Sequence, residues 1–278
     1  MDHIRITHDG PVGIITIDRR SRFNSLDVTT ARDLRKAGLH LSRDTKVRCI
    51  VLRGTGGVFC SGADLKYIRG GGDQRELGYL QPDARGVPTG YGECFKQILE
   101  YLHSTISEIR RAPKPFIAAV DGVAAAGGLG LAVCCDLVLA SRRSTFEYAY
   151  FKTALTGAES STFFLPKMLG LRRAMDFALL GPRVDAAAAR DLGLVSAVFD
   201  DERFEDDVAQ VARRLAAGPT ASFASAKRLM NEAAGVDRLD VHLDRELEAL
   251  IAAADGDDFR EGIDAFFDKR APNFSGAE

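Results

Sequence analysis

The chain has 278 residues, enough to bury a large core in one or two domains. Hydrophobic residues make up 46% and charged residues 27%, close to globular averages, so a disordered or fibrous chain is excluded. Lys and Arg number 37 against 39 Asp and Glu, and this formal net charge of -2 offers no general attraction to nucleic acid or to an anionic membrane.

Membrane insertion and export are not expected either. The most apolar stretch, Phe116 to Ala140, is interrupted by two aspartates and several glycines, so it is unsuited to crossing a bilayer. The first ten residues lack the basic and then apolar pattern of a secretory signal, which favours a cytoplasmic location. The five cysteines have no C-x-x-C spacing, and the adjacent Cys134 and Cys135 have no histidine nearby, so we expect buried free thiols and no metal site.

The first third of the chain has the pattern of a strand, a helix and a second strand. Val12 to Asp18 and Val47 to Arg53 are rich in β-branched residues and end at turn residues, which predicts two strands. Between them, Leu26 to Leu41 has helical propensity with leucines on one side. A strand, helix, strand order predicts a right-handed crossover between parallel strands, and thus an α/β fold.

A long loop and a long helix follow. Gly70 to Gly92 is dense in Gly, Pro, Asp and Gln, which predicts a mobile loop of the kind that covers binding sites. From Glu93 to Ile109 the apolar residues recur at helical spacing, and Pro113 lies beyond the predicted end.

The remaining elements alternate before the chain becomes helical. Phe116 to Val120 and Leu137 to Ala140 are apolar runs typical of buried strands, with a helix over residues 127 to 133 between them. Beyond residue 200 every long segment has a helical pattern, including a leucine stripe from Leu239 to Leu250. We therefore expect a sheet-bearing core over residues 1–200 and a helical subdomain over residues 201–278.

Two glycine-containing turns are candidates for chemistry. They are FCSGADL, residues 59–65, and DGVAAAGGLG, residues 121–130, and each lies where a predicted strand gives way to a helix. The first N–H groups of a helix have no partner within it, and glycine lets a ligand approach the backbone closely. Two such turns facing each other would hold two N–H donors around one oxygen, as an enolate or an oxyanion requires. The alternative is that both are tight turns only.

These turns belong to a larger resemblance. FCSGADL, the segment KPFIAAVDGVAAAGGLGLAVCCDLVLAS from Lys114 to Ser141, and FFDKRAPNF from Phe266 to Phe274 resemble the crotonase (enoyl-CoA hydratase/isomerase) superfamily in order and spacing. The resemblance implies a core of repeated ββα turns packed as a spiral, with C-terminal helices that build homotrimers or hexamers. It also implies an acyl-CoA substrate and no cofactor beyond the coenzyme A of that substrate.

The resemblance assigns roles to particular positions. The oxyanion hole falls on the backbone N–H groups of Ala63 and Gly127, both within the two turns. The coenzyme A channel falls on Arg22, Ser25, Leu26, Ser61, Asp64, Leu65 and Lys66. For Arg22 and Lys66 the alternative to a phosphate contact is an ordinary solvated surface charge.

The sequence departs from the family at its two hydratase glutamates. Hydration needs one group to take a proton from water and another to protonate the α-carbon, and paired carboxylates serve both transfers. Here the matching positions are Gly130 and Tyr150, so ordinary hydration by a glutamate pair is not expected. Tyr150 remains a candidate proton donor, with a core aromatic residue as the alternative.

A different carboxylate lies close to the position used by the family's isomerases. That position is Ala158, and Glu159 follows it directly. A shift of one residue could bring Glu159 into the site, or could turn it away by about 100° if the segment is helical. The alternative interpretation of Glu159 is an acid in the first turn of a helix, stabilised by the helix dipole.

The turn without glutamate and the segment LGLRRAM from Leu169 to Met175 also resemble the 4-chlorobenzoyl-CoA dehalogenase branch. The histidine that activates water there matches His103, but the nucleophilic aspartate matches Ala158, so halide displacement by that route is not expected. His103 has the alternative interpretation of a histidine at the edge of a packed helix.

The sequence thus predicts a cytoplasmic enzyme that polarises a thioester carbonyl between Ala63 and Gly127. Proton transfer falls to Glu159 or Tyr150, with His103 as a third candidate. The alternatives are a thioester hydrolase, a dehalogenase-like enzyme and a non-catalytic acyl-CoA-binding protein.

Overall fold

The computed structural model describes residues 1–73 and 90–276, and its base is a six-stranded sheet in the order β1-β2-β3-β5-β7-β10. Its strands are β1 (Ile4–Asp9), β2 (Val12–Ile17), β3 (Cys49–Gly54), β5 (Phe116–Val120), β7 (Leu137–Ser141) and β10 (Ala197–Phe199). β1 and β2 form an antiparallel hairpin, and all other neighbours are parallel, which confirms the parallel crossover predicted from the sequence.

Both faces of this sheet are covered, because alternate side chains of its strands enter two different clusters. Ile50 and Leu52 pack into the main core with α1 (Val28–Arg43) and α3 (Tyr91–Arg111). Cys49 and Val51 pack into a second cluster with α8 (Phe204–Ala217). Side chains of a strand point to opposite faces in turn, so a sheet covered on both sides needs the continuous apolar runs seen in the sequence.

The fold contains a second, smaller sheet of four strands. It has the order β4-β6-β8-β9, with β4 (Val58–Cys60), β6 (Val123–Ala125), β8 (Thr145–Glu147) and β9 (Val184–Asp185). Three consecutive strand pairs follow the same pattern, in which the first strand joins the larger sheet and the second joins the smaller one. These pairs are β3 and β4, β5 and β6, and β7 and β8. This repetition is the predicted ββα spiral.

Short helices connect these strands. They are η1 (Arg20–Arg22), α2 (Leu65–Arg69), α4 (Gly127–Val133), η2 (Tyr150–Thr153), α5 (Ser161–Leu169), α6 (Leu171–Leu179) and α7 (Ala186–Asp191). The predicted helix over residues 127 to 133 is confirmed as α4, with the expected bounds.

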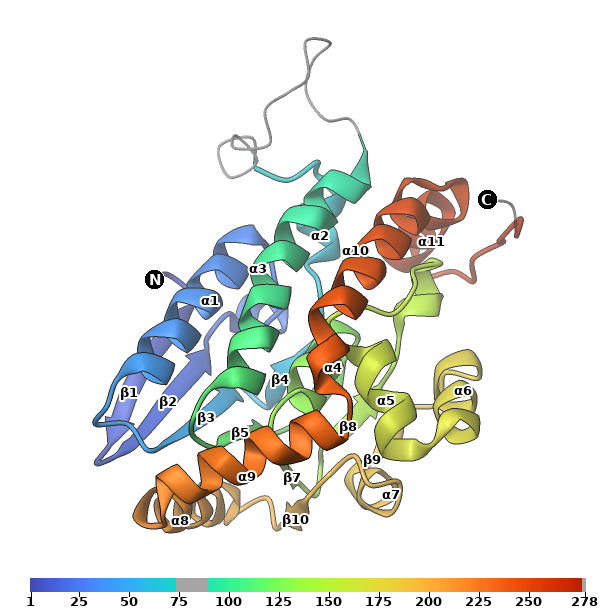
Figure 1. The fold of residues 1–278 in the computed structure, drawn as a ribbon. Coiled ribbons are helices and arrows are strands. Elements are labelled where there is room, and N and C mark those ends of the chain that lie inside the picture. Colours follow the sequence, from blue (N-terminus) through green and yellow to red (C-terminus); the bar gives the residue numbers. More distant parts are fainter. Residues whose placement is uncertain (74–89, 277–278) are drawn as a thin grey trace.

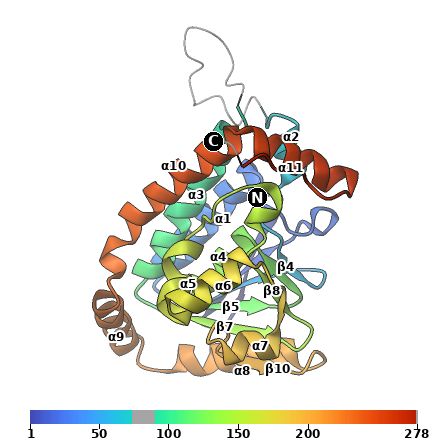
Figure 2. The same cartoon turned by 90° about the vertical axis from the view of Figure 1, so that its right-hand side faces the viewer.

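After β10 all described elements are helical, as predicted. They are α8, α9 (Thr220–Ala233), η3 (Val236–Arg238), α10 (Leu239–Asp255) and α11 (Asp257–Asp268). α1, α3 and α10 lie side by side (Figure 1), and Figure 2 shows α10 and α11 folded back over the core. In the leucine stripe of α10, Leu239, Leu243 and Leu250 are buried. Because α11 also packs on η2, the C-terminal helices reach the same region as the glycine turns.

Three further expectations can be compared with the structure. Within the loop predicted over Gly70 to Gly92, residues 74–89 lie outside the described residues. The five cysteines are free and buried, as expected. Of the helices that the structure describes, none combines the length and the apolar character needed to cross a bilayer.

Candidate active site

A cavity of about 410 Å³ lies where the two glycine turns meet η2 and the C-terminal helices. Its walls come from the segment around η1, both turns, the ends of β8 and α3, the chain between η2 and α5, and α10 and α11. The predicted site residues that line it are Arg22, Ser25, Ser61, Ala63, Asp64, Leu65, Lys66, Gly127, Tyr150 and Glu159. Residues separated by more than a hundred positions in the sequence therefore meet around one space.

The first glycine turn is fixed by backbone pairing on either side of Ala63. The Leu26 N–H donates to the carbonyl of Gly62 over 2.8 Å, and the Asp64 N–H donates to the carbonyl of Leu26 over 2.9 Å. Gly62 has φ +95°, a conformation that favours glycine. The N–H of Ala63, between these two bonds, donates to no acceptor among the described residues.

The second turn brings another unpaired N–H beside the first. Ala126 adopts φ +47° and donates its N–H to the carbonyl of Glu147, and α4 then begins at Gly127. A methyl group placed on Gly62 would lie 3.2 Å from the nitrogen of Gly127, so the two turns touch. Within residues 1–73 and 90–276, the Gly127 N–H also has no acceptor. Each turn therefore contributes one amide without an internal acceptor to the wall of the same cavity, and two such donors could serve an oxyanion.

Glu159 lies beside Gly127 of the second turn. A methyl group placed on Gly127 would lie 2.8 Å from Oε1 of Glu159, whose carboxylate accepts a hydrogen bond from the hydroxyl of Tyr150. Glu159 is 3% exposed and has φ +49°, and it precedes α5, whose N-cap is Ser160. The interpretation of Glu159 as an acid in the first helical turn is therefore wrong. The predicted rotation of the Glu159 side chain by about 100° assumed that the segment is helical, but the backbone of Glu159 is in the left-handed region.

The surroundings of Glu159 favour proton transfer near neutral pH. Burial raises the pKa of its carboxyl to about 7, the hydrogen bond from Tyr150 opposes this rise, and the negative charge of Glu246 adds to it. Burial and the neighbouring Glu159 raise the pKa of Tyr150 well above its ordinary value, so the phenol keeps its proton. A carboxyl of this pKa can both take up and release a proton, which suits a general acid or base.

The raised pKa predicts that Glu159→Gln stabilises the protein at alkaline pH. Between pH about 4.5 and about 7 the Glu159 carboxyl of the unfolded chain loses its proton while that of the folded chain keeps it. The free energy of unfolding of the wild type therefore falls as pH rises through that window. We expect the variant to exceed the wild type in free energy of unfolding at pH 8, with the difference shrinking toward pH 5. Urea denaturation at both pH values measures this, and a difference independent of pH would contradict it.

Gly130, at the first of the family's glutamate positions, leaves no room for a side chain. A methyl group there would lie 2.2 Å from the carbonyl oxygen of Glu159 and 2.8 Å from its Cβ. The backbone that carries Glu159 therefore occupies the space into which a side chain at position 130 would project.

This contact predicts that Gly130→Ala destabilises the protein, by about 1–3 kcal/mol as is typical of overpacking. Gly38, also within a helix, is a matched control, because a methyl group there would lie 3.8 Å from its nearest neighbour, Thr105. Gly38→Ala should stabilise by up to about 1 kcal/mol through helix propensity. Urea denaturation compares the two, and equal effects would show that position 130 is not crowded.

The other carboxylates of the cavity are neutralised by cations. Asp64 pairs with Arg19 over 2.7 Å and with Arg22, and it caps α2 by accepting two N–H groups. Although burial opposes it, these bonds hold the pKa of Asp64 below its ordinary value. Arg22, predicted to contact coenzyme A, thus directs its charge largely to a partner within the protein.

Glu147 is the other neutralised carboxylate, and it pairs with Lys152 and Arg183. Burial opposes these cations, yet together they lower its pKa. Among the acids of the described cavity wall, only Glu159 has no cation partner. Glu147 and Arg19 were not predicted from the sequence, because neither lies in a recognisable motif and their partners are distant along the chain.

Two predicted residues do not line the cavity. Leu26 is fully buried, and its contribution is the pair of backbone bonds that fixes the first turn. His103 is a buried residue of α3, and burial lowers its pKa to about 4. Its Nε2 has no hydrogen-bond partner in the described part of the chain. The geometry thus favours the interpretation of His103 as a packed helix residue.

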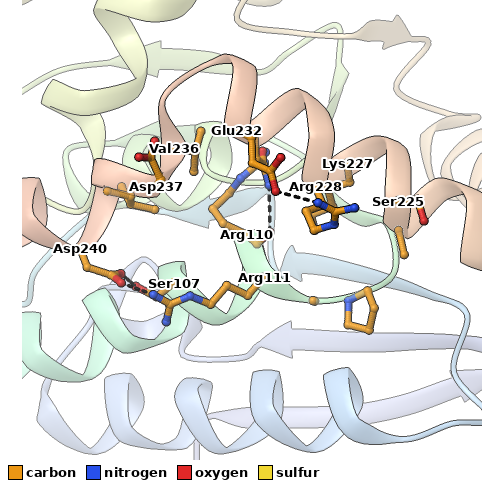
Figure 3. Close-up of a pocket in the computed structure, with 15 residues that line it drawn as sticks. Ser107, Arg110, Arg111, Ser225, Lys227, Arg228, Glu232, Val236, Asp237 and Asp240 are labelled. Atoms are coloured by element: carbon orange, nitrogen blue, oxygen red, sulfur yellow. Dashed lines mark hydrogen bonds and ion pairs between the residues drawn. The ribbon is translucent and has the colours of Figure 1, made fainter.

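A second hollow of about 430 Å³ lies between α3, α9 and the start of α10 (Figure 3). Two pairs of its charged groups interact with each other: Arg111 points to Asp240, and Arg228 donates to Glu232 over 2.8 Å (Figure 3). None of the predicted site residues lines it. The cavity beside Glu159 is therefore the candidate active site, because ten of the predicted site residues line it.

Comparisons with known proteins identify the family of the chain. Residues 7–85 and 92–277 match the family model for enoyl-CoA hydratase/isomerase. The chain is 34% identical over 263 residues to 1,2-epoxyphenylacetyl-CoA isomerase of Escherichia coli K12, covering 94% of each protein. It is 30% identical to 4-chlorobenzoyl coenzyme A dehalogenase-2 of an Arthrobacter species, covering 96% of this chain and 91% of that protein. A crystal structure of an enoyl-CoA hydratase from Mycobacterium avium subsp. paratuberculosis superposes with a TM-score of 0.84 at 30% identity, covering 98% of each chain.

Proposed function

The chain belongs to the enoyl-CoA hydratase/isomerase family, and we propose that it isomerises enoyl-CoA thioesters by moving one proton between the α- and γ-carbons of the acyl group. The observation that carries this proposal is the position of Glu159: one buried, unneutralised carboxylate beside Gly127, in a cavity whose wall also includes the unpaired amides of Gly127 and Ala63. A relative of 34% identity that is named as a CoA-thioester isomerase supports it.

The number of carboxylates distinguishes isomerisation from hydration. Hydration requires a water to be activated at the β-carbon while the α-carbon is protonated, which two carboxylates perform together. Here the two hydratase positions carry glycine and tyrosine, and the remaining acids of the described cavity wall are paired with cations. One carboxylate suffices when the same proton is removed from one carbon and returned to another.

The proposed steps follow from this arrangement. The thioester oxygen accepts the N–H groups of Ala63 and Gly127, which stabilise negative charge as it develops there. Glu159 takes a proton from the γ-carbon, the electron pair moves into the chain, and an enolate forms on the oxygen. The protonated Glu159 then returns the proton to the α-carbon, which moves the double bond without change of mass.

The rim of the cavity supplies groups suited to the coenzyme A portion. Lys66 is exposed at the rim and makes no ion pair with the described residues, so its charge is free for a phosphate. Ser25 and Ser61 provide nearby hydroxyls, and Leu65 contributes apolar surface. We further propose the homotrimeric or hexameric assembly and the cytoplasmic location that the family resemblance implies.

The test is incubation of the protein with 2-enoyl-CoA and 3-enoyl-CoA thioesters of several chain lengths. We expect their interconversion, followed by the absorbance of the conjugated thioester and by chromatography, with no change of mass. A gain of one water would identify a hydratase, and release of free coenzyme A would identify a hydrolase. Saturable binding without turnover across the set would identify a binding protein and reject the proposal.

The described wall of the cavity lacks the residues that dehalogenation would require. The position of the nucleophile is Ala158, which is fully buried and has no carboxylate, and His103 does not line the cavity. A halide-release assay on a halobenzoyl-CoA is expected to be negative.

A further inference from the structure

A second buried carboxylate, Glu246 of α10, holds the segment that follows Glu159. It accepts the N–H of Ser160 over 2.8 Å, the N–H of Thr162 over 3.0 Å, and the hydroxyl of Thr162. Glu246 is 4% exposed and does not line the cavity. Its role thus concerns the backbone beside the site and not the substrate.

That backbone needs an external partner. Glu159 and Ser160 are consecutive non-glycine residues with φ +49° and φ +67°, a conformation that L-residues adopt only when their surroundings hold them there. The N-cap of α5 is Ser160, yet its side chain makes no capping bond, and its buried Oγ has no partner among the described residues. The first N–H groups of a helix require acceptors, and Glu246 provides them from another helix.

Resting on the proposed function, we propose that Glu246 is the positioning residue for Glu159: by binding the amides of Ser160 and Thr162, it fixes the left-handed turn that directs the Glu159 carboxylate toward Gly127. The link is the backbone of Ser160, which follows Glu159 directly and donates its N–H to Glu246. Glu246 therefore acts through the chain that carries Glu159 and not through a contact with substrate.

The groups that face Glu246 also make it an electrostatic neighbour of the site. Tyr148 and Tyr150 face Glu246 from the chain after β8. Glu159, which precedes α5, and Thr162, which lies within α5, also face it, and His242 faces it from the same helix, α10. Burial raises the pKa of Glu246 to about 7, while its bonds to Thr162 and Ser160 oppose the rise. Burial and the cations Arg245 and Lys167 lower the pKa of His242, so it is neutral at pH 7.

The test replaces Glu246 with glutamine, which keeps the volume and one acceptor but loses the second acceptor and the charge. Glu248→Gln is the control, because Glu248 is an exposed acid of the same helix. For Glu246→Gln we expect kcat to fall about 10-fold or more, since small displacements of a catalytic group are costly, while KM changes by less than about 3-fold. The control should behave as wild type in both constants.

A readout without substrate separates this proposal from the proposed function. Infrared difference spectroscopy follows the protonated Glu159 carboxyl as pH is varied, with Glu159→Gln identifying its band. Loss of the neighbouring negative charge should lower the pH at which this band disappears in Glu246→Gln, and circular dichroism verifies that the variant is folded. Thr162→Val, which removes one of the three donors, should give a smaller change in the same direction.

The outcomes are distinct. A lower kcat at retained KM in Glu246→Gln supports the positioning role, whereas a shifted titration of Glu159 at unchanged kcat shows an electrostatic effect alone and rejects it. If neither changes in Glu246→Gln and Thr162→Val, the role is rejected. If the wild type turns over no thioester, the proposed function fails, and the infrared titration still shows separately whether Glu246 is coupled to Glu159.

Discussion

Replacing Glu159 with glutamine is expected to lower kcat for enoyl-CoA isomerisation by about 100-fold or more, the usual effect of removing a general base. The glutamine side chain would keep the shape of the original and could still accept the Tyr150 hydrogen bond, but it could not take a proton. Because the base must be ionised to act, the wild-type kcat should rise with pH through about 7 and then level off. Steady-state rates from pH 5 to 9 measure this rise.

Tyr150→Phe is the companion variant, because the Tyr150 hydroxyl stabilises the ionised form of Glu159. Its loss should raise the pKa of Glu159 further and move the rise in kcat to higher pH, with activity recovered there. If Tyr150 were itself the proton donor, activity would be lost at every pH. An unchanged rate in Glu159→Gln would remove Glu159 from the mechanism.

Proline at Ala63 or at Gly127 is expected to lower kcat by about 100- to 1000-fold, because each substitution removes one donor to the enolate oxygen. Neither N–H has an acceptor among the described residues, so no internal hydrogen bond is lost with it. Ala63→Pro has a further advantage, because Ala63 lies in the other turn and its replacement leaves the contact between Gly127 and Glu159 in place.

Free coenzyme A provides the control for these two variants, since it has no thioester carbonyl. Its dissociation constant, measured by calorimetry, should remain within a few-fold of the wild-type value, and the melting temperature should show an intact fold. A retained kcat in a folded proline variant would contradict the assignment of the oxyanion hole.

Four strands of the larger sheet, β2, β3, β5 and β7, could be predicted because they are largely apolar runs. β1 and β10 were not predicted, because β1 contains several polar residues and β10 has only three residues. Phe116 to Val120 and the following helix at residues 127–133 have the predicted bounds, since glycines and charges punctuate both ends of each. The smaller sheet could not be predicted from periodicity. Its strands have two or three residues each, too few to establish an alternation, and only the family resemblance implied them.

The site shows a similar division. The two glycine-containing turns could be selected from the sequence because each lies between a strand and a helix, and the family resemblance then assigned Ala63 and Gly127 within them. The direction of Glu159 was not, because it depends on a left-handed turn held by Glu246, 86 residues after Ser160 in the sequence. Arg22 was predicted to face coenzyme A or solvent, but its partner Asp64 lies 42 residues away and no local pattern connects the two.

The contact between Gly130 and the backbone of Glu159 constrains how this chain could evolve a different chemistry. A glutamate at position 130 and the present turn at position 159 exclude each other, so a single substitution cannot convert one arrangement into the other. Any route to a two-carboxylate hydratase would first have to rebuild the turn before α5. The two arrangements of carboxylates therefore cannot coexist on the present backbone, and a change from one to the other needs coordinated changes at both positions.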